Sequence, residues 1–198
     1  SLSHRNIRMS RFLIDSMEDA RRRTLKLIDG LDAVQLMGPR LPTVNPLRWE
    51  IGHAAYFYEY WILRQHLGLE PVLASVDSLY NSITIAHDER WDLPLPSLDD
   101  TLAYMRAVHD RVRRHVEQDG PDPRRDYLLE YAIYHEDMHT EAFTYTRQTL
   151  AYPTPDIGSA VPDQLMQGRL AGDTQIPGGT FMLGATPQDG FVFDNEKW

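Results

Sequence analysis

The sequence contains no cysteine among its 198 residues, which excludes disulfide bonds and thiolate metal ligands. Any metal ion must therefore be held by histidine or carboxylate side chains. The sequence also lacks the run of about 18 apolar residues that a membrane-spanning helix needs, and the apolar core of a signal peptide. The absence of cysteine is compatible with a reducing compartment, and we expect a cytoplasmic protein.

Basic residues are outnumbered, with 20 Lys and Arg against 29 Asp and Glu, which gives a formal net charge of −9. A protein that binds nucleic acid or an anionic membrane surface needs a basic face. We therefore expect no nucleic acid and no membrane among its partners. The content of 42% hydrophobic and 25% charged residues is ordinary for a globular domain.

Apolar residues recur near the helical period in four segments, which predicts helices over residues 10–29, 45–67, 97–119 and 123–150. Asn45 is expected to cap the second helix, with Pro46 at its first position. Ser97, followed by two aspartates, is expected to open the third helix. Residues 69–97 form a long connection. Four such helices joined by a long crossover predict a mainly α fold, a four-helix bundle.

The composition changes after residue 151. Pro, Gly, Asp and Gln are frequent over 152–175, and residues 176–184 predict a short strand, a turn and a second strand. The last segment alone is too short to bury a core. We therefore predict a bundle over 1–151, a linker over 152–175 and the beginning of a second domain over 176–198. The alternative is a tail that packs on the bundle.

Two histidines of the fourth predicted helix, His135 and His139, are four residues apart. On a helix they differ by only about 40° around the axis, so both imidazoles point the same way. They share an apolar stripe, and two imidazoles buried side by side are costly unless they are hydrogen-bonded or bound to a metal. The pair therefore predicts two metal ligands, with two hydrogen-bonded core histidines as the alternative. The stripe comprises Leu128, Ala132, His135, His139, Ala142, Phe143, Thr146 and Leu150.

His53 is the natural third ligand, although a lone core histidine is the alternative. It lies early in the second predicted helix, on one stripe with Trp49, Phe57 and Tyr60. Gly52 and the alanines that follow His53 leave room for close helix approach or for a small ligand. Three neutral imidazoles leave coordination positions open, which suits Fe(II) or a catalytic Zn(II).

The remaining histidines carry a weaker signal. His87 lies in the long connection and could line a site. The others, which are His4, His66, His109 and His115, are expected on the solvated surface. The motif His135-Glu136-x-x-His139 also matches the zinc-protease pattern, in which Glu is the general base. That alternative is disfavoured because no histidine follows His139.

These residues together resemble a known family. The Gly52-His53 pair and the motif His135-Glu136-x-x-His139-x-Glu141 resemble the metal-binding bundle called DinB-like. Residues 176–184 and 191–198 resemble the start of a formylglycine-generating-enzyme-like domain, an α+β fold related to C-type lectins. In this order, the two blocks are similar to the ergothioneine-type sulfoxide synthases and to the ovothiol and selenoneine synthases.

The resemblance implies a non-haem Fe(II) held by His53, His135 and His139, with O2 as co-substrate. It implies formation of a carbon–sulfur or carbon–selenium bond on the imidazole ring of hercynine, with a thiol or a selenosugar as the donor. Arg90 falls near the arginine with which relatives hold the carboxylate of a thiol substrate. The catalytic tyrosine and most substrate contacts are expected in the second domain, outside these residues.

Met138 departs from the ergothioneine pattern, because relatives often carry a glutamine there that helps to recognise the imidazole substrate. Met138 is thus a substrate-binding candidate that cannot form that hydrogen bond. Residues 90–97 also look more like the selenoneine branch, which we prefer on these two grounds. The alternatives are a DinB-like Zn(II)-dependent thiol transferase and a non-catalytic metal-binding module.

Overall fold

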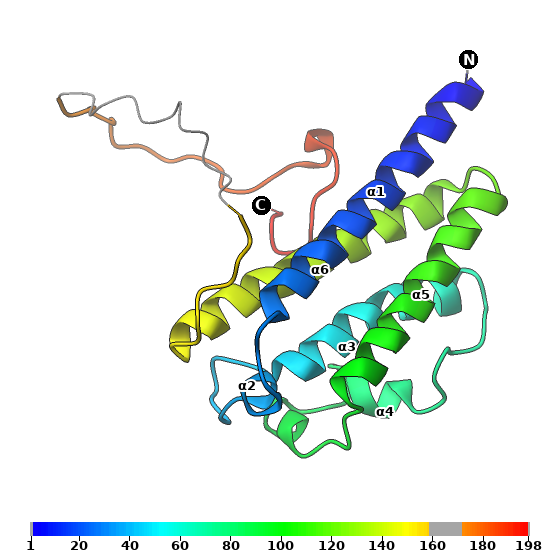
Figure 1. Ribbon diagram of the computed structural model, residues 1–198. Helices are drawn as coiled ribbons and strands as arrows, with labels where there is room; N and C mark the ends of the chain where they lie inside the picture. Colours follow the sequence, from blue (N-terminus) through cyan, green and yellow to red (C-terminus); the bar gives the residue numbers. More distant parts are fainter. Residues whose placement is uncertain (1, 159–171, 198) are drawn as a thin grey trace. The chain divides into compact units, whose positions relative to one another are not determined.

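The computed structural model describes residues 2–158 and 172–197. The chain divides into two compact units, Ser1–Asp156 and Ile157–Trp198. The first unit is helical throughout its regular structure (Figure 1). Its long helices are α1 (Leu2–Ile28), α3 (Leu47–Tyr58), which continues as the π-helix Glu59–His66, α5 (Leu98–Gln118) and α6 (Pro123–Thr149). Its short helices are α2 (Ala33–Met37), α4 (Val76–Tyr80) and the 3-10 helix His87–Trp91.

The four long helices form the predicted bundle. Helix α1 packs against α6 and α5, and α3 packs against the same two helices (Figure 1). The largest side chains of the core come from all four helices and include Met17, Tyr58, Met105 and Phe143, each no more than 1% exposed. The mainly helical fold is therefore confirmed. Within the described part of the chain, no helix has the length and apolar composition needed to cross a membrane.

Two helix starts differ from the prediction. Helix α1 begins at Leu2 rather than Ser10, because no proline or glycine interrupts the residues between them. Helix α3 begins at Leu47, and Asn45 does not cap it. The Asn45 amide instead donates a hydrogen bond to Glu50 Oε1, 3.0 Å away. The long connection also contains more structure than its pattern predicted, namely α4 and the 3-10 helix.

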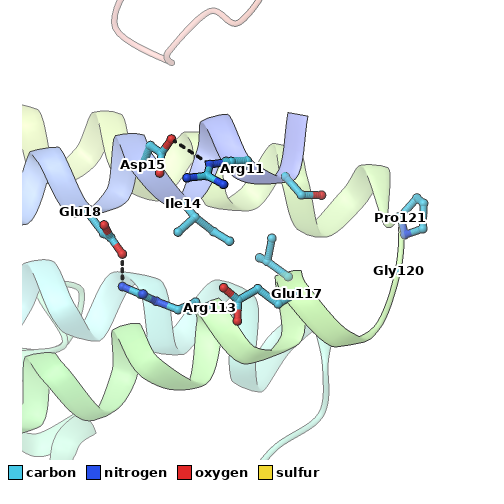
Figure 2. Close-up of a pocket in the computed structure, with 10 residues that line it drawn as sticks. Arg11, Ile14, Asp15, Glu18, Arg113, Glu117, Gly120 and Pro121 are labelled. Carbon is cyan, nitrogen blue, oxygen red and sulfur yellow. Dashed lines mark hydrogen bonds and ion pairs between the residues drawn. The ribbon is translucent and has the colours of Figure 1, made fainter. Parts of the chain in front are cut away.

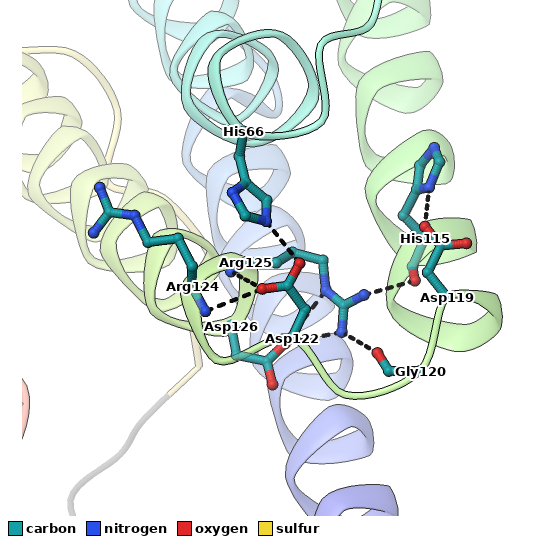
Figure 3. Close-up of polar contacts among 8 residues, drawn as sticks. All are labelled: His66, His115, Asp119, Gly120, Asp122, Arg124, Arg125 and Asp126. Atoms are coloured by element: carbon teal, nitrogen blue, oxygen red, sulfur yellow. Dashed lines mark hydrogen bonds and ion pairs between the residues drawn. The ribbon is translucent and has the colours of Figure 1, made fainter.

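The junction between α5 and α6 is fastened by polar contacts (Figure 3). Asp122 caps α6, because its Oδ1 accepts the backbone N–H of Arg125 at 3.0 Å. The other carboxylate oxygen lies 2.6 Å from His66 Nε2, which comes from the π-helix. The Arg125 guanidinium donates to the carbonyl oxygens of His115 and Gly120, at 2.9 and 2.8 Å. The buried guanidinium of Arg125 and the carbonyl oxygens at the end of α5 therefore satisfy one another.

A groove of about 790 Å³ lies between α1 and α5 (Figure 2). Ile14 and Val116 supply its apolar lining, and the ion pair between Glu18 and Arg113 joins the two helices across it. None of the three predicted ligand histidines lines this groove, so it is separate from the site described below. Its lining is Ser10, Arg11, Ile14, Asp15, Glu18, Arg113, Val116, Glu117, Gly120 and Pro121.

The second unit corrects a local prediction. Its described residues contain the 3-10 helix Pro187–Asp189 and one isolated parallel bridge between Ala185 and Lys197, but no strand over 176–184. Ile176 and Leu183 are 85% and 78% exposed. A short strand is stable only when a partner pairs its backbone and covers its apolar side chains. The described part of this unit supplies neither.

Candidate metal centre

The three histidines predicted as metal ligands lie together. One ring nitrogen from each of His53, His135 and His139 can be chosen so that all lie within 4.8 Å of one another. The ring centroids are 5.1 Å apart for His53 and His135, 4.9 Å for His53 and His139, and 4.6 Å for His135 and His139. Helix α3 supplies the first imidazole and one turn of α6 supplies the other two.

The orientation of His53 is set by the protein backbone. Its Nδ1 lies 2.8 Å from the carbonyl oxygen of Tyr80, the last residue of α4. A carbonyl oxygen only accepts hydrogen bonds, so Nδ1 carries the proton and Nε2 carries the lone pair. The ring also stacks on Trp49, with centroids 4.7 Å apart and planes 9° apart. Trp49 in turn donates from Nε1 to the carbonyl oxygen of Leu79, 2.8 Å away.

Gly52 makes this arrangement possible. A Cβ atom at this position would lie 2.2 Å from the ring of Tyr80, well inside van der Waals contact. The glycine therefore lets α4 approach α3 closely enough for the Tyr80 carbonyl to reach His53. The sequence predicted room for a close helix approach here, and the structure shows that the Tyr80 ring occupies it.

The other two rings have different surroundings. His139 Nδ1 lies 3.2 Å from Glu50 Oε1, a carboxylate of α3 that is 1% exposed. His135 stacks on Phe57, with ring centroids 3.7 Å apart. Its Nδ1 is buried and has no hydrogen-bond partner in the described part of the protein.

Burial keeps the imidazoles of His53 and His135 neutral. Burial lowers the pKa of His53 to about 3, with a smaller contribution from the neighbouring His139. Burial also lowers the pKa of His135 well below its usual value. Neutral imidazole is the form that binds a metal ion, so protons do not compete for these two rings at pH 7.

The residues present fit a bound metal ion. The unpartnered nitrogen of His135 carries a desolvation cost that coordination to a metal would remove. His53 and, through Glu50, His139 each have one ring nitrogen engaged, which leaves the other for coordination. Three neutral nitrogen donors suit Fe(II) and Zn(II) alike.

Of the two predicted substrate-binding residues, Arg90 lies beside the cluster and Met138 is a sequence neighbour of His139. The Arg90 guanidinium lies 4.0 Å above the Trp49 ring, which stacks on His53. Its Nη1 donates to Asn45 Oδ1 at 2.6 Å. Met138 precedes His139 on α6 and is 40% exposed. Both side chains are thus near the ligands in sequence or space, and their role in substrate binding remains a prediction.

His109 was expected on the surface, and that prediction is wrong. It is 3% exposed, and its Nε2 lies 4.0 Å from Glu136 Oε2. It follows Met105 by one helical turn on the buried face of α5. Burial lowers the pKa of His109 to about 3, so its imidazole is neutral at pH 7, and burial raises the pKa of Glu136 above its usual value.

The other histidines lie outside the cluster. His66 and His115 are half-buried and contact Asp122 and Asp119. His87, which the sequence allowed to line a site, contacts the carbonyl oxygen of Val44 at 2.7 Å. The side chain of His4 lies outside the described residues.

Glu136 does not occupy the position that a zinc-protease mechanism requires. Its two carboxyl oxygens accept hydrogen bonds from Thr24, at 2.7 Å, and from Tyr58, at 2.8 Å. These partners hold it in the core between α1, α3 and α6. The structure therefore agrees with the expectation that this motif is not a protease site.

Two residues that contact the ligands were missed from the sequence. Glu50 lies three residues before His53, so the spacing placed it one turn away on the same helix, but a lone glutamate carried no further signal. Tyr80 contributes through its backbone carbonyl, and side-chain identity gives no sign of such a role.

Three curated proteins named hercynine oxygenase are similar in sequence to this chain. The chain is 28% identical over 189 residues to a hercynine oxygenase of Mycolicibacterium smegmatis, which covers 93% of this chain and 44% of that protein. It is 28% identical over 185 residues to the hercynine oxygenase of Mycolicibacterium thermoresistibile, covering 90% and 40%. With the hercynine oxygenase of Mycobacterium tuberculosis, it shares 29% identity over 124 residues, covering 62% and 29%.

The chain thus spans less than half the length of the curated relatives that it matches. The sequence profile described as the DinB superfamily matches residues 16–143, which include all three clustered histidines, the whole of α3 and most of α6. This chain belongs to the DinB superfamily.

Proposed function

We propose that this chain is the metal-binding part of a non-haem Fe(II)- and O2-dependent synthase that modifies the imidazole ring of hercynine. The observation that carries the proposal is the convergence of His53, His135 and His139 within 4.8 Å, with a buried ring nitrogen left unpartnered. The relatives named hercynine oxygenase support hercynine as the substrate and oxidation as the reaction class.

The alignments also support a second domain. A match that covers 93% of the chain extends beyond Asp156 into the second compact unit. In our proposal, residues 176–198 begin a formylglycine-generating-enzyme-like domain, which supplies the catalytic tyrosine and most substrate contacts. The bundle then contributes the metal ligands and the donor-binding arginine.

The proposed reaction balances with O2 as the only oxidant. A ring C–H bond and the S–H bond of the donor break, and a C–S bond forms, which releases two electrons and two protons. Oxidation of the sulfur to a sulfoxide releases two more electrons. One O2 accepts all four electrons, leaving one oxygen atom on sulfur and the other in water. A selenol donor gives the same balance with a selenoxide.

The residues of the chain have separate roles in this proposal. His53, His135 and His139 hold Fe(II), which when bound supplies the redox chemistry with O2. With a thiol donor that carries a carboxylate, Arg90 binds that carboxylate through its guanidinium, because the two groups match in charge and geometry. The rings of Trp49 and Phe57 cover His53 and His135 and keep water from their faces.

Metal analysis of protein purified without oxygen tests the ligand set. We expect close to one iron per chain, and loss of that iron in His139→Ala. His115→Ala is the control, since it removes a histidine that contacts Asp119 outside the cluster. Full iron occupancy in His139→Ala would refute the assignment.

Oxygen uptake distinguishes iron from zinc chemistry. With the full-length protein, we expect oxygen uptake that requires both hercynine and a thiol or selenol. Activity with Zn(II) and no oxygen uptake would instead indicate a thiol transferase, and metal binding without turnover would indicate a non-catalytic module.

The choice between sulfur and selenium rests on Met138 and on residues 90–97, and the mass of the product decides it. Incubation of hercynine with a selenosugar and, separately, with a thiol shows which donor is incorporated. Preference for the selenosugar would support the selenoneine branch. Preference for the thiol would place the chain with the ergothioneine enzymes.

A further inference from the structure

Glu50 links the two helices that carry the clustered histidines. It lies on α3, one turn before His53, and its Oε1 lies 3.2 Å from Nδ1 of His139 on α6. A carboxylate oxygen accepts hydrogen bonds, so this contact favours the form of His139 in which Nδ1 is protonated and Nε2 carries the lone pair. The ring of His139 is thereby oriented as the Tyr80 carbonyl orients His53.

The surroundings of Glu50 are unusual for a residue with only a structural role. Its side chain is 1% exposed, and Oε2 has no hydrogen-bond partner in the described part of the protein. A buried carboxylate with an unsatisfied oxygen costs stability compared with an apolar residue of similar size. A function for its charge beside the neutral imidazoles accounts for this cost.

A chain of polar contacts holds the Glu50 carboxylate in place. Asn45 Nδ2 donates to Glu50 Oε1 at 3.0 Å, and Asn45 Oδ1 accepts from Arg90 at 2.6 Å. Because the arginine can only donate, it fixes which end of the Asn45 amide faces Glu50. Arg90 is itself held over the Trp49 ring.

We infer that Glu50 is a positioning residue of the metal centre, which holds His139 with Nε2 toward the metal and places a negative charge beside three neutral ligands. Asn45 and Arg90 hold Glu50 for this task. The inference rests on the proposed metal site. Carboxylates that accept from the second nitrogen of a ligating histidine commonly raise metal affinity about 10- to 100-fold.

Titration with Fe(II) without oxygen, and with Co(II) followed by its visible absorption, tests the inference. We expect Glu50→Leu to weaken affinity for both metals by about 10- to 100-fold. Glu50→Gln keeps an oxygen that can accept from His139 but removes the charge. We expect it to recover part of the affinity and to shift the Co(II) bands.

Glu59→Gln is the matched control. Glu59 is also a fully buried glutamate, and it lies in the π-helix that continues α3. Its carboxylate accepts hydrogen bonds from Tyr104 and from the Val72 backbone instead of from a clustered histidine. We expect this variant to lose stability while keeping the metal affinity and the Co(II) spectrum of the wild type.

The outcomes separate this inference from the proposed function. Wild-type protein that binds neither metal would refute the metal site itself. Tight wild-type binding with unchanged affinity and spectrum in Glu50→Leu would overturn the role of Glu50 alone. If Glu50→Leu does not fold, the same titrations are made on Glu50→Gln and Asn45→Ala. Metal affinity and a Co(II) spectrum equal to those of the wild type in both variants would overturn the inference. Weakened metal binding with shifted Co(II) bands would support it.

Discussion

The Nδ1 atom of His53 lies 2.8 Å from the carbonyl oxygen of Tyr80, so the backbone of a short helix fixes the orientation of this ring. A backbone acceptor cannot rotate away as a side chain can. The position of α4 therefore sets the direction in which His53 presents its second nitrogen. Gly52 sets that position, because the Tyr80 ring lies where its Cβ would be.

Gly52→Ala is expected to weaken both folding and metal binding. The added Cβ would lie 2.2 Å from the Tyr80 ring, so α4 must shift and the carbonyl must move from His53. Overpacking of this kind costs about 1–3 kcal/mol of unfolding free energy. Urea unfolding and Co(II) titration measure the two effects.

Gly68→Ala is the control for Gly52→Ala. Gly68 has φ +68°, and a Cβ at this position would meet no atom within 4 Å, so its substitution introduces backbone strain without a clash. That strain costs about 1–2 kcal/mol and leaves His53 untouched. Equal metal affinity in the two variants would contradict the proposed role of Gly52.

Replacement of His109 by leucine is expected to reduce the sensitivity of the protein to acid. The imidazole is buried, which lowers its pKa to about 3, whereas in the unfolded chain it binds a proton near pH 6.5. As pH falls from 6.5 toward 3, the unfolded state therefore takes up a proton that the folded state does not, and stability falls. The slope is about 1.4 kcal/mol per pH unit for one such group.

Urea unfolding of metal-free protein at pH 7 and pH 5 measures this slope. We expect His109→Leu to lose less stability than the wild type between these two values. Val112→Ala, a substitution on the same buried face of α5, should lower stability equally at both pH values. A wild-type slope in His109→Leu would show that the group is not buried in its neutral form.

The sequence predicted the long helices and the pair of His135 and His139 because both depend on spacing within a single helix. His53 was predicted as the third ligand on the strength of that pair. His135 and His139 share a face because residues four apart always do so on an α-helix. The predicted stripe of Trp49, His53 and Phe57 agrees with the stacking of Trp49 on His53 and of Phe57 on His135. Such patterns follow from the 3.6-residue period alone.

Contacts between distant segments were not predictable in the same way. The Tyr80 carbonyl reaches His53 only because α4 folds against α3, and no residue type marks that approach except Gly52. His109 was misassigned because its polarity outweighed its position on the apolar stripe of α5. Chemistry that depends on tertiary packing therefore needed the structure.

Asp122→Ala is expected to cost about 1 kcal/mol at pH 7, the usual value of a helix cap. The Arg125 backbone N–H, and then His66, lower the pKa of the Asp122 carboxyl. A carboxyl with a lowered pKa stabilises the fold above its unfolded value of 3.8, and this contribution is lost as pH falls through the folded value. The difference between variant and wild type should therefore shrink in acid.

Ser97→Ala provides the comparison for Asp122→Ala. Ser97 caps α5 through a hydroxyl that accepts the Asp100 backbone N–H at 3.1 Å, and this hydroxyl does not titrate. Its removal should cost about 1 kcal/mol at neutral and at acidic pH. A cost of Asp122→Ala that stays constant down to pH 3 would contradict the assignment of the cap to the ionised carboxyl.

Arg90→Ala is expected to raise the KM for a donor thiol that carries a carboxylate by about 10- to 100-fold, the value of a lost charge-assisted hydrogen bond. Because Arg90 also holds Asn45, the assay must be run at saturating metal so that weakened metal binding does not contribute. A thiol without a carboxylate should show the same KM in variant and wild type. Arg40→Ala is the control, since Arg40 pairs with Asp92 and lies 5.9 Å from the Trp91 ring. An equal rise in KM for both thiols would mean that Arg90 acts on the metal centre and not on the donor.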